Sequence, residues 1–292
     1  MSMAKTGPKF LNSDAAARIL GVNVSTIKRW TDSGKLACIR SAGGHRKFLM
    51  SHLADFVASN EKGGGHINIL PLDTPENRET AYHIQQGDCE YLVPQVEQLA
   101  LQGDYAKIHD ILSELYISRH PLPAIYDNLV TPVLHCIGEL WAEGAINITE
   151  EHVASQGIRD SLIRLQDIVH VSNERDEKVL CMNLSDELHD IAIKMVQHIL
   201  EERGFEVLFT GQRTPAERME EVLCIYQPRR IYISSTYLEN PEAMQEELDH
   251  ILHICWNLRT RVFVGGAGFD QLDIREPFVE KRLKTFREVA ES

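Results

Sequence analysis

The chain has 292 residues, which is long enough for two or three domains. No apolar run approaches the length of a membrane-spanning helix, and the N-terminus, with Lys5 and Lys9 but no apolar core, is unlike a signal peptide. The six cysteines are scattered without a close pair, which favours reduced thiols over a disulfide framework or a zinc site. We therefore expect a soluble cytoplasmic protein with no membrane partner.

Charge is divided unevenly along the chain. Residues 1–60 carry nine Lys and Arg against three Asp and Glu, a net charge of +6, whereas the remaining residues carry 21 against 40, a net charge of −19. A basic head on an acidic body fits a head that binds nucleic acid and a body that does not. On charge alone, an ordinary fluctuation of surface charge is the alternative.

The basic head carries the pattern of two short helices joined by a glycine-containing turn. The first is expected at residues 15–20, and the second at 26–32 with Ser25 as its cap. This arrangement predicts a helix-turn-helix, whose second helix enters the major groove of DNA. Ile27 and Trp30 are three residues apart and should face the core. The side chains left for DNA are Thr26, Lys28 and Arg29.

A wing is expected to follow these helices. Residues 39–48 predict a hairpin with a glycine tip and basic flanks, which would touch phosphates or the minor groove. Residues 10–59 resemble the winged helix-turn-helix of the MerR and excisionase families, in which Gly-His-Arg recurs in the wing. The resemblance implies a DNA-binding domain over residues 1–60 and a double-stranded DNA operator as partner. The wing residues expected to bind DNA are Arg40, His45, Arg46 and Lys47.

The middle of the chain is predicted to be helical. Residues 61–76 contain a glycine run and then prolines, which indicate a flexible linker with a stiffer end. Residues 77–172 show helical periodicity and hardly any strand pattern, so we expect a four-helix bundle. The expected helices are 78–87 running into 91–101, 105–119, 123–143 and 149–171.

A tryptophan and a Glu-His pair are brought together by the last loop of this bundle. Trp141 is followed, after nine residues, by Glu151 and His152. The pattern resembles the Trp-x9-Glu-His motif of light-sensing cobalamin repressors of the CarH type. That resemblance implies a chamber for the adenosyl group above cobalt, with apolar contact from the ring and hydrogen bonds from Glu151. The alternative is a core tryptophan and the charged first turn of a helix.

The last part of the chain, residues 177–292, alternates strand and helix patterns. Together with the head and the bundle it predicts a multidomain fold, α and α/β, that ends in a doubly wound, Rossmann-like parallel sheet. No fifth strand is evident after residue 270. The expected strands are 178–184, 205–210, 229–235 and 261–265, and the expected helices are 189–202, 215–226, 241–258 and 276–290.

An exposed imidazole is expected at the carboxyl end of the first of these strands, where such sheets bind ligands. Glu187 can hold one ring nitrogen of His189 and leave the other for a metal. Glu187, His189 and the adjoining Asp190 resemble the Asp/Glu-x-His-x-x-Gly motif of cobalamin-binding domains, although Ala192 replaces the glycine. The resemblance implies that His189 is the lower axial ligand of cobalt. A solvated or capping histidine is the alternative.

Two further strand ends complete the expected site. The third strand ends in hydroxyls, with Ser234 and Thr236 near the place where the cobalamin family favours Ser-x-Leu. Gly265 and Gly266 follow the fourth strand, and glycines allow close approach to a bulky ligand. In the cobalamin-binding family a Gly-Gly pair at this place accommodates the nucleotide tail.

The resemblance covers nearly the whole chain and implies a cobalamin-dependent transcriptional regulator that is not an enzyme. Adenosylcobalamin would sit between bundle and α/β domain, and a homo-oligomer, dimer or tetramer, would hold several heads on DNA until light breaks the cobalt–carbon bond. Known light-sensing relatives carry a His directly after the Trp, where this chain has Ala142. His135 or His152 could replace it, or the regulator could sense cofactor supply or redox state instead of light. A corrinoid methyl-carrier component of a methyltransferase system and a regulator of a non-corrin ligand are two different functions that the sequence leaves open.

Overall fold

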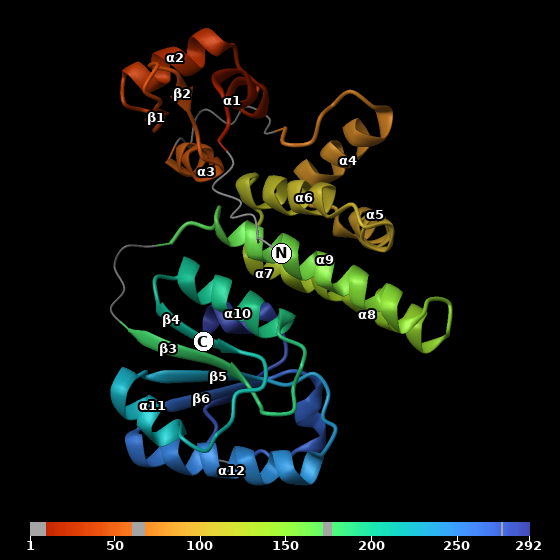
Figure 1. Cartoon of the computed structure of the whole chain (residues 1–292), viewed down its shortest axis with the longest axis vertical. Helices are drawn as coiled ribbons and strands as arrows, with labels where there is room; N and C mark the ends of the chain where they lie inside the picture. Colours follow the sequence, from red (N-terminus) through yellow and green to blue (C-terminus); the bar gives the residue numbers. More distant parts are fainter. Residues whose placement is uncertain (1–9, 60–67, 172–176, 276) are drawn as a thin grey trace. The chain divides into compact units, whose positions relative to one another are not determined.

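The computed structural model describes residues 10–59, 68–171, 177–275 and 277–292 (Figure 1). The glycine-rich part of the expected linker, residues 61–67, lies outside these ranges. The chain divides into two compact units, of which the first is Met1–Pro121 with Asn128–His170 and the second is Leu122–Asp127 with Val171–Ser292. In the described ranges, no helix combines the length and the apolarity needed to cross a membrane.

The head contains the expected helix-turn-helix and wing. Asn12 caps the first helix by accepting a hydrogen bond from the Ala15 amide at 2.8 Å. The expected cap of the second helix is wrong: that helix begins at Val24, one residue before Ser25. The core of the head includes the fully buried Ile27 and Phe48. Its elements are α1 (Ser13–Ile19), α2 (Val24–Asp32), β1 (Ile39–Arg40), β2 (Arg46–Lys47) and α3 (Met50–Ser59).

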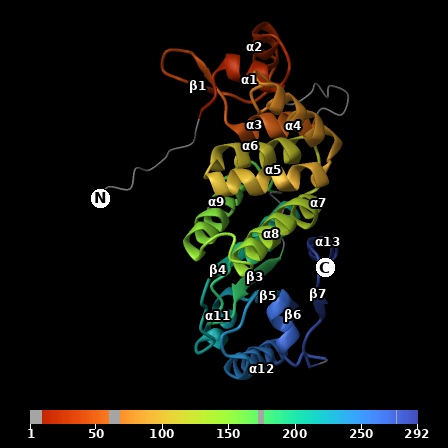
Figure 2. The ribbon, with the colours of Figure 1, turned by 90° about the vertical axis from the view of Figure 1, so that its right-hand side faces the viewer.

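Four helices, α5 (Cys89–Gln102), α6 (Tyr105–Ile117), α8 (Thr131–Ala142) and α9 (Ile148–Gln166), form a bundle in the first unit (Figures 1 and 2). A fifth helix, α4 (Pro75–Gln86), packs against α5 and α6. Gly87, with a φ of 67°, ends α4, so the expected run of residues 78–101 forms two helices. In α9, a Cβ at Gly157 would lie 1.9 Å from the ring of Tyr105, so only glycine allows α6 and α9 to approach so closely.

Part of the segment expected to be a linker, residues 61–76, is packed within the first unit. Ile69 and Leu70 are buried in the first unit, with 6% and 2% of their surface exposed. Their amides donate hydrogen bonds of 2.7 and 3.0 Å to Oε2 of Glu114, on α6. The stiffer end of the linker is therefore anchored to the bundle.

The helix expected at residues 123–143 is interrupted. A short helix, α7 (Leu122–Ile125), is followed by a π-helical turn, η1 (Tyr126–Val130), before α8 begins. Tyr126 is fully buried in the second unit, and its hydroxyl lies 2.8 Å from Nδ1 of His198. The carboxylate of Asp127 accepts hydrogen bonds from the first two amides of α13. Six residues that sequence periodicity assigned to the bundle thus complete the core of the α/β unit.

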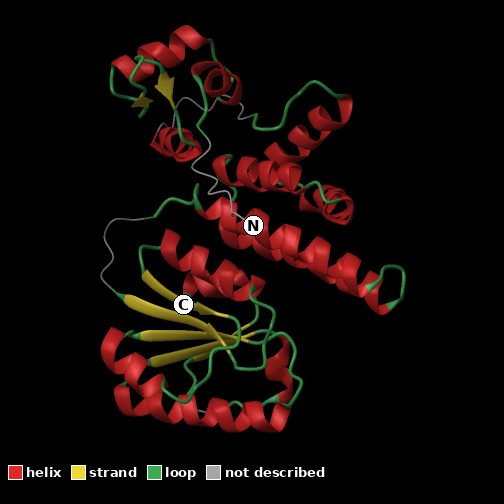
Figure 3. Ribbon diagram, in the orientation of Figure 1, coloured by secondary structure: helices red, strands yellow, loops and turns green. Residues whose placement is uncertain are grey.

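The second unit is built on a parallel sheet, whose strands are yellow in Figure 3. Its five strands follow the order β4-β3-β5-β6-β7. α10 covers one face, and α11 and α12 cover the other (Figure 1). The strand order reverses between β3 and β5, so a ligand crevice is expected at the carboxyl ends of these two strands. The elements are β3 (Lys178–Asn183), α10 (Ile191–Glu202), β4 (Glu206–Gly211), α11 (Met219–Tyr226), β5 (Arg230–Ser234), α12 (Pro241–Leu258), β6 (Arg261–Gly265), η2 (Ala267–Gln271), β7 (Lys281–Leu283) and α13 (Phe286–Glu291).

The helix expected at residues 276–290 is wrong. The fifth strand, β7, occupies Lys281–Leu283, and α13 begins only at Phe286. β7 lies at the sheet edge and pairs only with β6, so its exposed positions carry charge instead of an apolar run.

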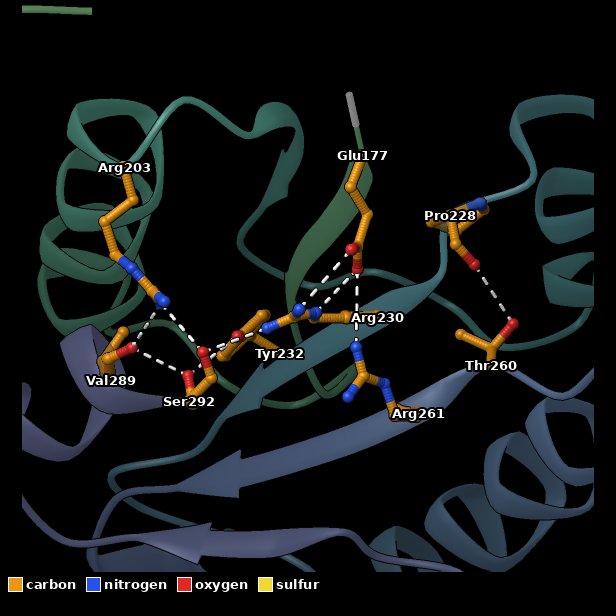
Figure 4. A network of polar contacts seen from close by, with 9 residues as sticks. All are labelled: Glu177, Arg203, Pro228, Arg230, Tyr232, Thr260, Arg261, Val289 and Ser292. Atoms are coloured by element: carbon orange, nitrogen blue, oxygen red, sulfur yellow. Dashed lines mark hydrogen bonds and ion pairs between the residues drawn. The ribbon is translucent and has the colours of Figure 1, made fainter. Parts of the chain in front are cut away.

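A polar network at the amino ends of the strands fixes the end of α13 (Figure 4). Arg230 forms an ion pair of 2.6 Å with Glu177 and donates to the carbonyl of Ser292 at 3.0 Å. Arg203, at the end of α10, donates to the same carbonyl at 2.9 Å. The hydroxyl of Tyr232 lies 2.9 Å from that of Ser292. This network stabilises the sheet at the end opposite to the switch-point crevice.

Candidate functional site

His189 lies in the loop that follows β3, with 60% of its side chain exposed. Its Nδ1 lies 2.6 Å from Oε1 of Glu187, and its own backbone amide donates to the same oxygen at 2.6 Å. Glu187 is buried, with 1% of its side chain exposed. The predicted Glu-His pair is therefore present, and a metal bound to this imidazole would be bound through Nε2.

Glu187 is held by the segment that follows β5. Its Oε2 accepts hydrogen bonds from the amides of Thr236 and Tyr237, and the Ser235 hydroxyl lies 3.4 Å away. Burial alone would raise the pKa of Glu187, but the hydrogen bonds from His189, Thr236 and Tyr237 outweigh it and lower the pKa. The carboxylate is thus ionised and oriented, as a group that fixes an imidazole must be.

Asn183, the last residue of β3, is a part of this site that the sequence reasoning missed. It is fully buried, and its side-chain amide donates a 2.9 Å hydrogen bond to the carbonyl of His189. Among the described residues, its Oδ1 has no hydrogen-bond partner. The only signal for Asn183 in the sequence was a polar residue at the end of an apolar strand.

Asp190, expected to bind the cofactor, is 3% exposed and stands at the N-terminus of α10.

The hydroxyls and glycines at the other strand ends contact one another. Ser234 is 5% exposed at the end of β5, and it is Ser235 whose hydroxyl points toward Glu187. Gly266 has a φ of +102°, and a Cβ there would lie 2.1 Å from the carbonyl oxygen of Ser235. At Gly265 a Cβ would lie 3.0 Å from the carbonyl oxygen of Leu283. Close packing against the backbone at the strand ends therefore requires glycine at both positions, independently of any ligand.

The bundle residues lie at the hairpin end of α8 and α9. Trp141 is in the last turn of α8 and is 49% exposed, so it is not a core residue. Glu151 and His152 are in the first turns of α9, with His152 Nδ1 2.5 Å from Glu151 Oε2. The other oxygen of Glu151 accepts a 2.6 Å hydrogen bond from Ser155. An exposed indole and a restrained carboxylate suit contact with a ligand that has an apolar face and hydroxyl groups.

In the head, two of the three α2 residues that were predicted to face DNA are exposed. Lys28 and Arg29 are exposed and Thr26 is half-buried, whereas Ile27 is fully buried. In the wing, Arg40 and His45 are exposed and Lys47 is half-buried.

Arg46 has a different environment from the other wing residues. Only 16% of its side chain is exposed, and it forms an ion pair of 2.6 Å with Asp32 at the end of α2. Its Nε donates to Thr31 at 2.7 Å. Asp32 also binds Arg40 at 3.0 Å, and the bond from Arg46 holds the pKa of Asp32 below its usual value. Asp32 thereby ties the wing to the second helix, a contact the sequence reasoning missed.

No group of three or more His, Cys, Asp or Glu side chains gathers as a metal site within the described ranges. A single oriented histidine fits a metal whose remaining ligands come from a cofactor. The exposed His189 with its buried Glu187 meets that condition.

Three models of protein families match this chain, each over a different range of residues. A model of a helix-turn-helix domain matches residues 10–61, and two models of a B12 binding domain match residues 92–166 and 177–279. The HTH-type transcriptional repressor CarH of Myxococcus xanthus is 27% identical over 265 residues, which cover 86% of this chain and 87% of that protein. The predicted resemblance to a CarH-type regulator is confirmed.

The fold of this chain is similar to that of a solved corrinoid protein. The monomethylamine corrinoid protein of Methanosarcina barkeri matches with a TM-score of 0.53 at 11% identity, over 69% of this chain and 96% of that one. Together with the domain matches, it confirms the predicted fold class of a helix-turn-helix head followed by B12-binding domains, one helical and one with a parallel sheet.

Proposed function

We propose that this chain is a cobalamin-dependent regulator of transcription and not an enzyme. The observation that carries the proposal is the exposed His189 held by the buried Glu187. This pair lies in the region that matches a B12 binding domain, and the first part of the same chain matches a helix-turn-helix domain. The similarity to a transcriptional repressor over most of both chains supports the same function.

The cofactor we propose is adenosylcobalamin. A corrin ring would itself supply most ligands of cobalt, so a single protein ligand would suffice, and we assign the role of lower ligand to His189. Ser234, Thr236, Asp190, Gly265 and Gly266 are proposed to line the lower side. The exposed indole of Trp141, with Glu151 and His152, is proposed to contact the adenosyl group.

The signal we propose is light. Adenosylcobalamin supplies, when bound, a cobalt–carbon bond that light breaks. Trp141 and the Glu151-His152 turn are then the side chains that sense whether the adenosyl group is present, and we propose that the dark protein is a dimer or tetramer that disassembles on illumination. Linked heads gain roughly 10²–10⁴ in apparent affinity over a single head, so disassembly alone would release DNA. Because Ala142 follows the tryptophan, His135, His152 or water would have to take the place of a histidine at that position, or the illuminated state would not be capped.

DNA is proposed to bind to the exposed face of α2 and to the wing. Lys28, Arg29 and Thr26 would enter the major groove, and Arg40, His45 and Lys47 would contact phosphates or the minor groove. Arg46 is proposed to act chiefly by fixing the wing through Asp32, because little of its side chain is exposed.

A corrinoid methyl carrier is the competing function, since a corrinoid protein shares the fold. The helix-turn-helix match at residues 10–61 favours the regulator, because a methyl carrier has no use for a DNA-binding head.

One experiment separates these functions. The purified protein is loaded with adenosylcobalamin in the dark, and its elution volume and DNA affinity are measured before and after illumination. A regulator that senses light loses oligomer size and DNA affinity together. DNA binding that depends on the cofactor but not on light would leave cobalamin as a chemical signal. Cobalamin binding with no DNA binding would favour the carrier.

A further inference from the structure

The loop that carries His189 is tied to α12 by the residue that begins it. The backbone amide of Ser185 donates to Oε1 of Glu247 at 3.1 Å, and the Ser185 hydroxyl donates to Oε2 of the same carboxylate. Glu247 stands in the second turn of α12, more than 50 residues further along the chain. Both oxygens of this one side chain are therefore committed to one residue of the loop.

The next two residues of the loop are fixed to the same region. Oδ2 of Asp186 accepts hydrogen bonds from the amides of Glu239 and Asn240, at 3.1 and 3.3 Å, just before α12 begins. Glu187 accepts from the segment that follows β5. Three consecutive residues are thus bound across the switch point, and His189 follows two positions later.

Glu247 occupies an unfavourable place for a carboxylate. Burial raises its pKa, the two hydrogen bonds from Ser185 oppose that rise, and the nearby carboxylates of Asp186 and Glu217 add to it. In the described part of the chain, its hydrogen bonds all go to Ser185. A half-buried carboxylate among like charges lowers the stability of the fold. We therefore attribute the role of Glu247 to the position of the loop that it binds and not to the stability of the fold.

We propose that Glu247 is a positioning residue for the lower cobalt ligand. By holding both donors of Ser185 it fixes the start of the His189 loop, so that the imidazole is presented to cobalt without first ordering the loop. This inference rests on the proposed assignment of His189. Metal ligands require placement within about 0.5 Å, and a loop that is ordered before binding avoids the entropy cost of ordering it.

The test measures how strongly His189 holds cobalt. Protein loaded with adenosylcobalamin is titrated with acid in the dark, and absorbance follows the change from the histidine-bound to the base-off form. Protons compete with cobalt for the imidazole, so weaker ligation moves the midpoint to higher pH. Glu247→Ala should lower the ligation constant about tenfold, which raises the midpoint by about one pH unit.

Matched variants separate positioning from general damage to the fold. Glu247→Gln can still accept from the Ser185 amide and donate to its hydroxyl, so its midpoint should lie between those of the wild type and Glu247→Ala. Glu246→Ala removes an exposed carboxylate one position away on α12 and should leave the midpoint unchanged. If Glu247→Ala does not fold, Ser185→Ala, which loses only the hydroxyl contact, should still raise the midpoint.

An unchanged midpoint in Glu247→Ala, or in both Ser185→Ala and Glu247→Gln, would overturn the proposal. An equal shift in Glu246→Ala would overturn it too, since the effect would then be one of charge. A wild-type protein that binds no cobalamin, or that binds it without His189, would instead refute the proposed function on which the inference rests.

Discussion

Gly266 should be the glycine of the α/β unit that is least tolerant of a side chain. Its φ of 102° and ψ of 160° fall in a region that is essentially restricted to glycine, where another residue costs about 1–3 kcal/mol. The added Cβ would lie 2.1 Å from the Ser235 carbonyl oxygen, so backbone must shift, at a further cost of about 1–3 kcal/mol. Gly266→Ala should therefore destabilise the unit by about 2–6 kcal/mol, a large part of a usual total of about 5–15 kcal/mol.

Gly211→Ala is the matched control in the same unit. Gly211 also has a positive φ, of +80°, but its Cβ would meet only a ring carbon of Phe209 at 3.4 Å, so we expect a loss of about 1–2 kcal/mol. Urea unfolding of the cofactor-free protein is followed by the fluorescence of Trp256, on α12, with Trp30 and Trp141 replaced by Phe. Equal losses in the two glycine variants would refute the steric argument at Gly266.

Three further predictions concern the first unit. Lys28→Ala should weaken DNA binding and reduce the slope of log K against log salt by about 1. Asp32→Ala should also weaken DNA binding although it removes a negative charge, because the wing loses its tie through Arg46; tighter binding would contradict this account. Burial raises the pKa of Glu114 to about 7, with nearby Asp110 adding to the rise, so the folded chain retains a proton that the unfolded chain releases near the ordinary value of 4.5. The contribution of Glu114 to the free energy of unfolding should therefore fall by about 3 kcal/mol as pH rises from 4.5 to 7 and change little above pH 7. Glu114→Gln should lose this pH dependence. If thermal unfolding of Glu114→Gln showed the same pH dependence as the wild type across that range, the assignment would be contradicted.

The sequence predicted the elements whose pattern is local. The four main strands carry uninterrupted apolar runs, and the structure places β3, β5 and β6 within one residue of the predicted bounds. The interruption at Tyr126 was not predictable from periodicity, because an apolar helix pattern is the same whether its partners are bundle helices or α10 and α13. The edge strand β7 was missed because it has only three residues and the first two, Lys281 and Arg282, are charged, so it shows no apolar strand pattern.

In the candidate site, too, contacts between residues close in sequence were predictable, and contacts that depend on the fold were not. Glu187 and His189 are two residues apart, so their contact follows from local spacing. Ser235 and Glu247 join the site only through strand pairing and packing of α12, which no local pattern reveals. Asn183 joins it because the loop after β3 folds back and brings the His189 carbonyl to the Asn183 side chain. In the head, Arg40 and Arg46 both contact Asp32, but only Arg46 is largely buried there, and this difference too depends on the fold.

The axial ligation of cobalt by His189 is the claim on which the account depends most. The direct measurement is the absorption spectrum of bound adenosylcobalamin in the dark, for the wild-type protein and for His189→Ala at the same pH. The account predicts a histidine-bound spectrum for the wild type, and for the variant either the base-off spectrum or no bound cofactor. Identical spectra from equally loaded proteins would contradict it.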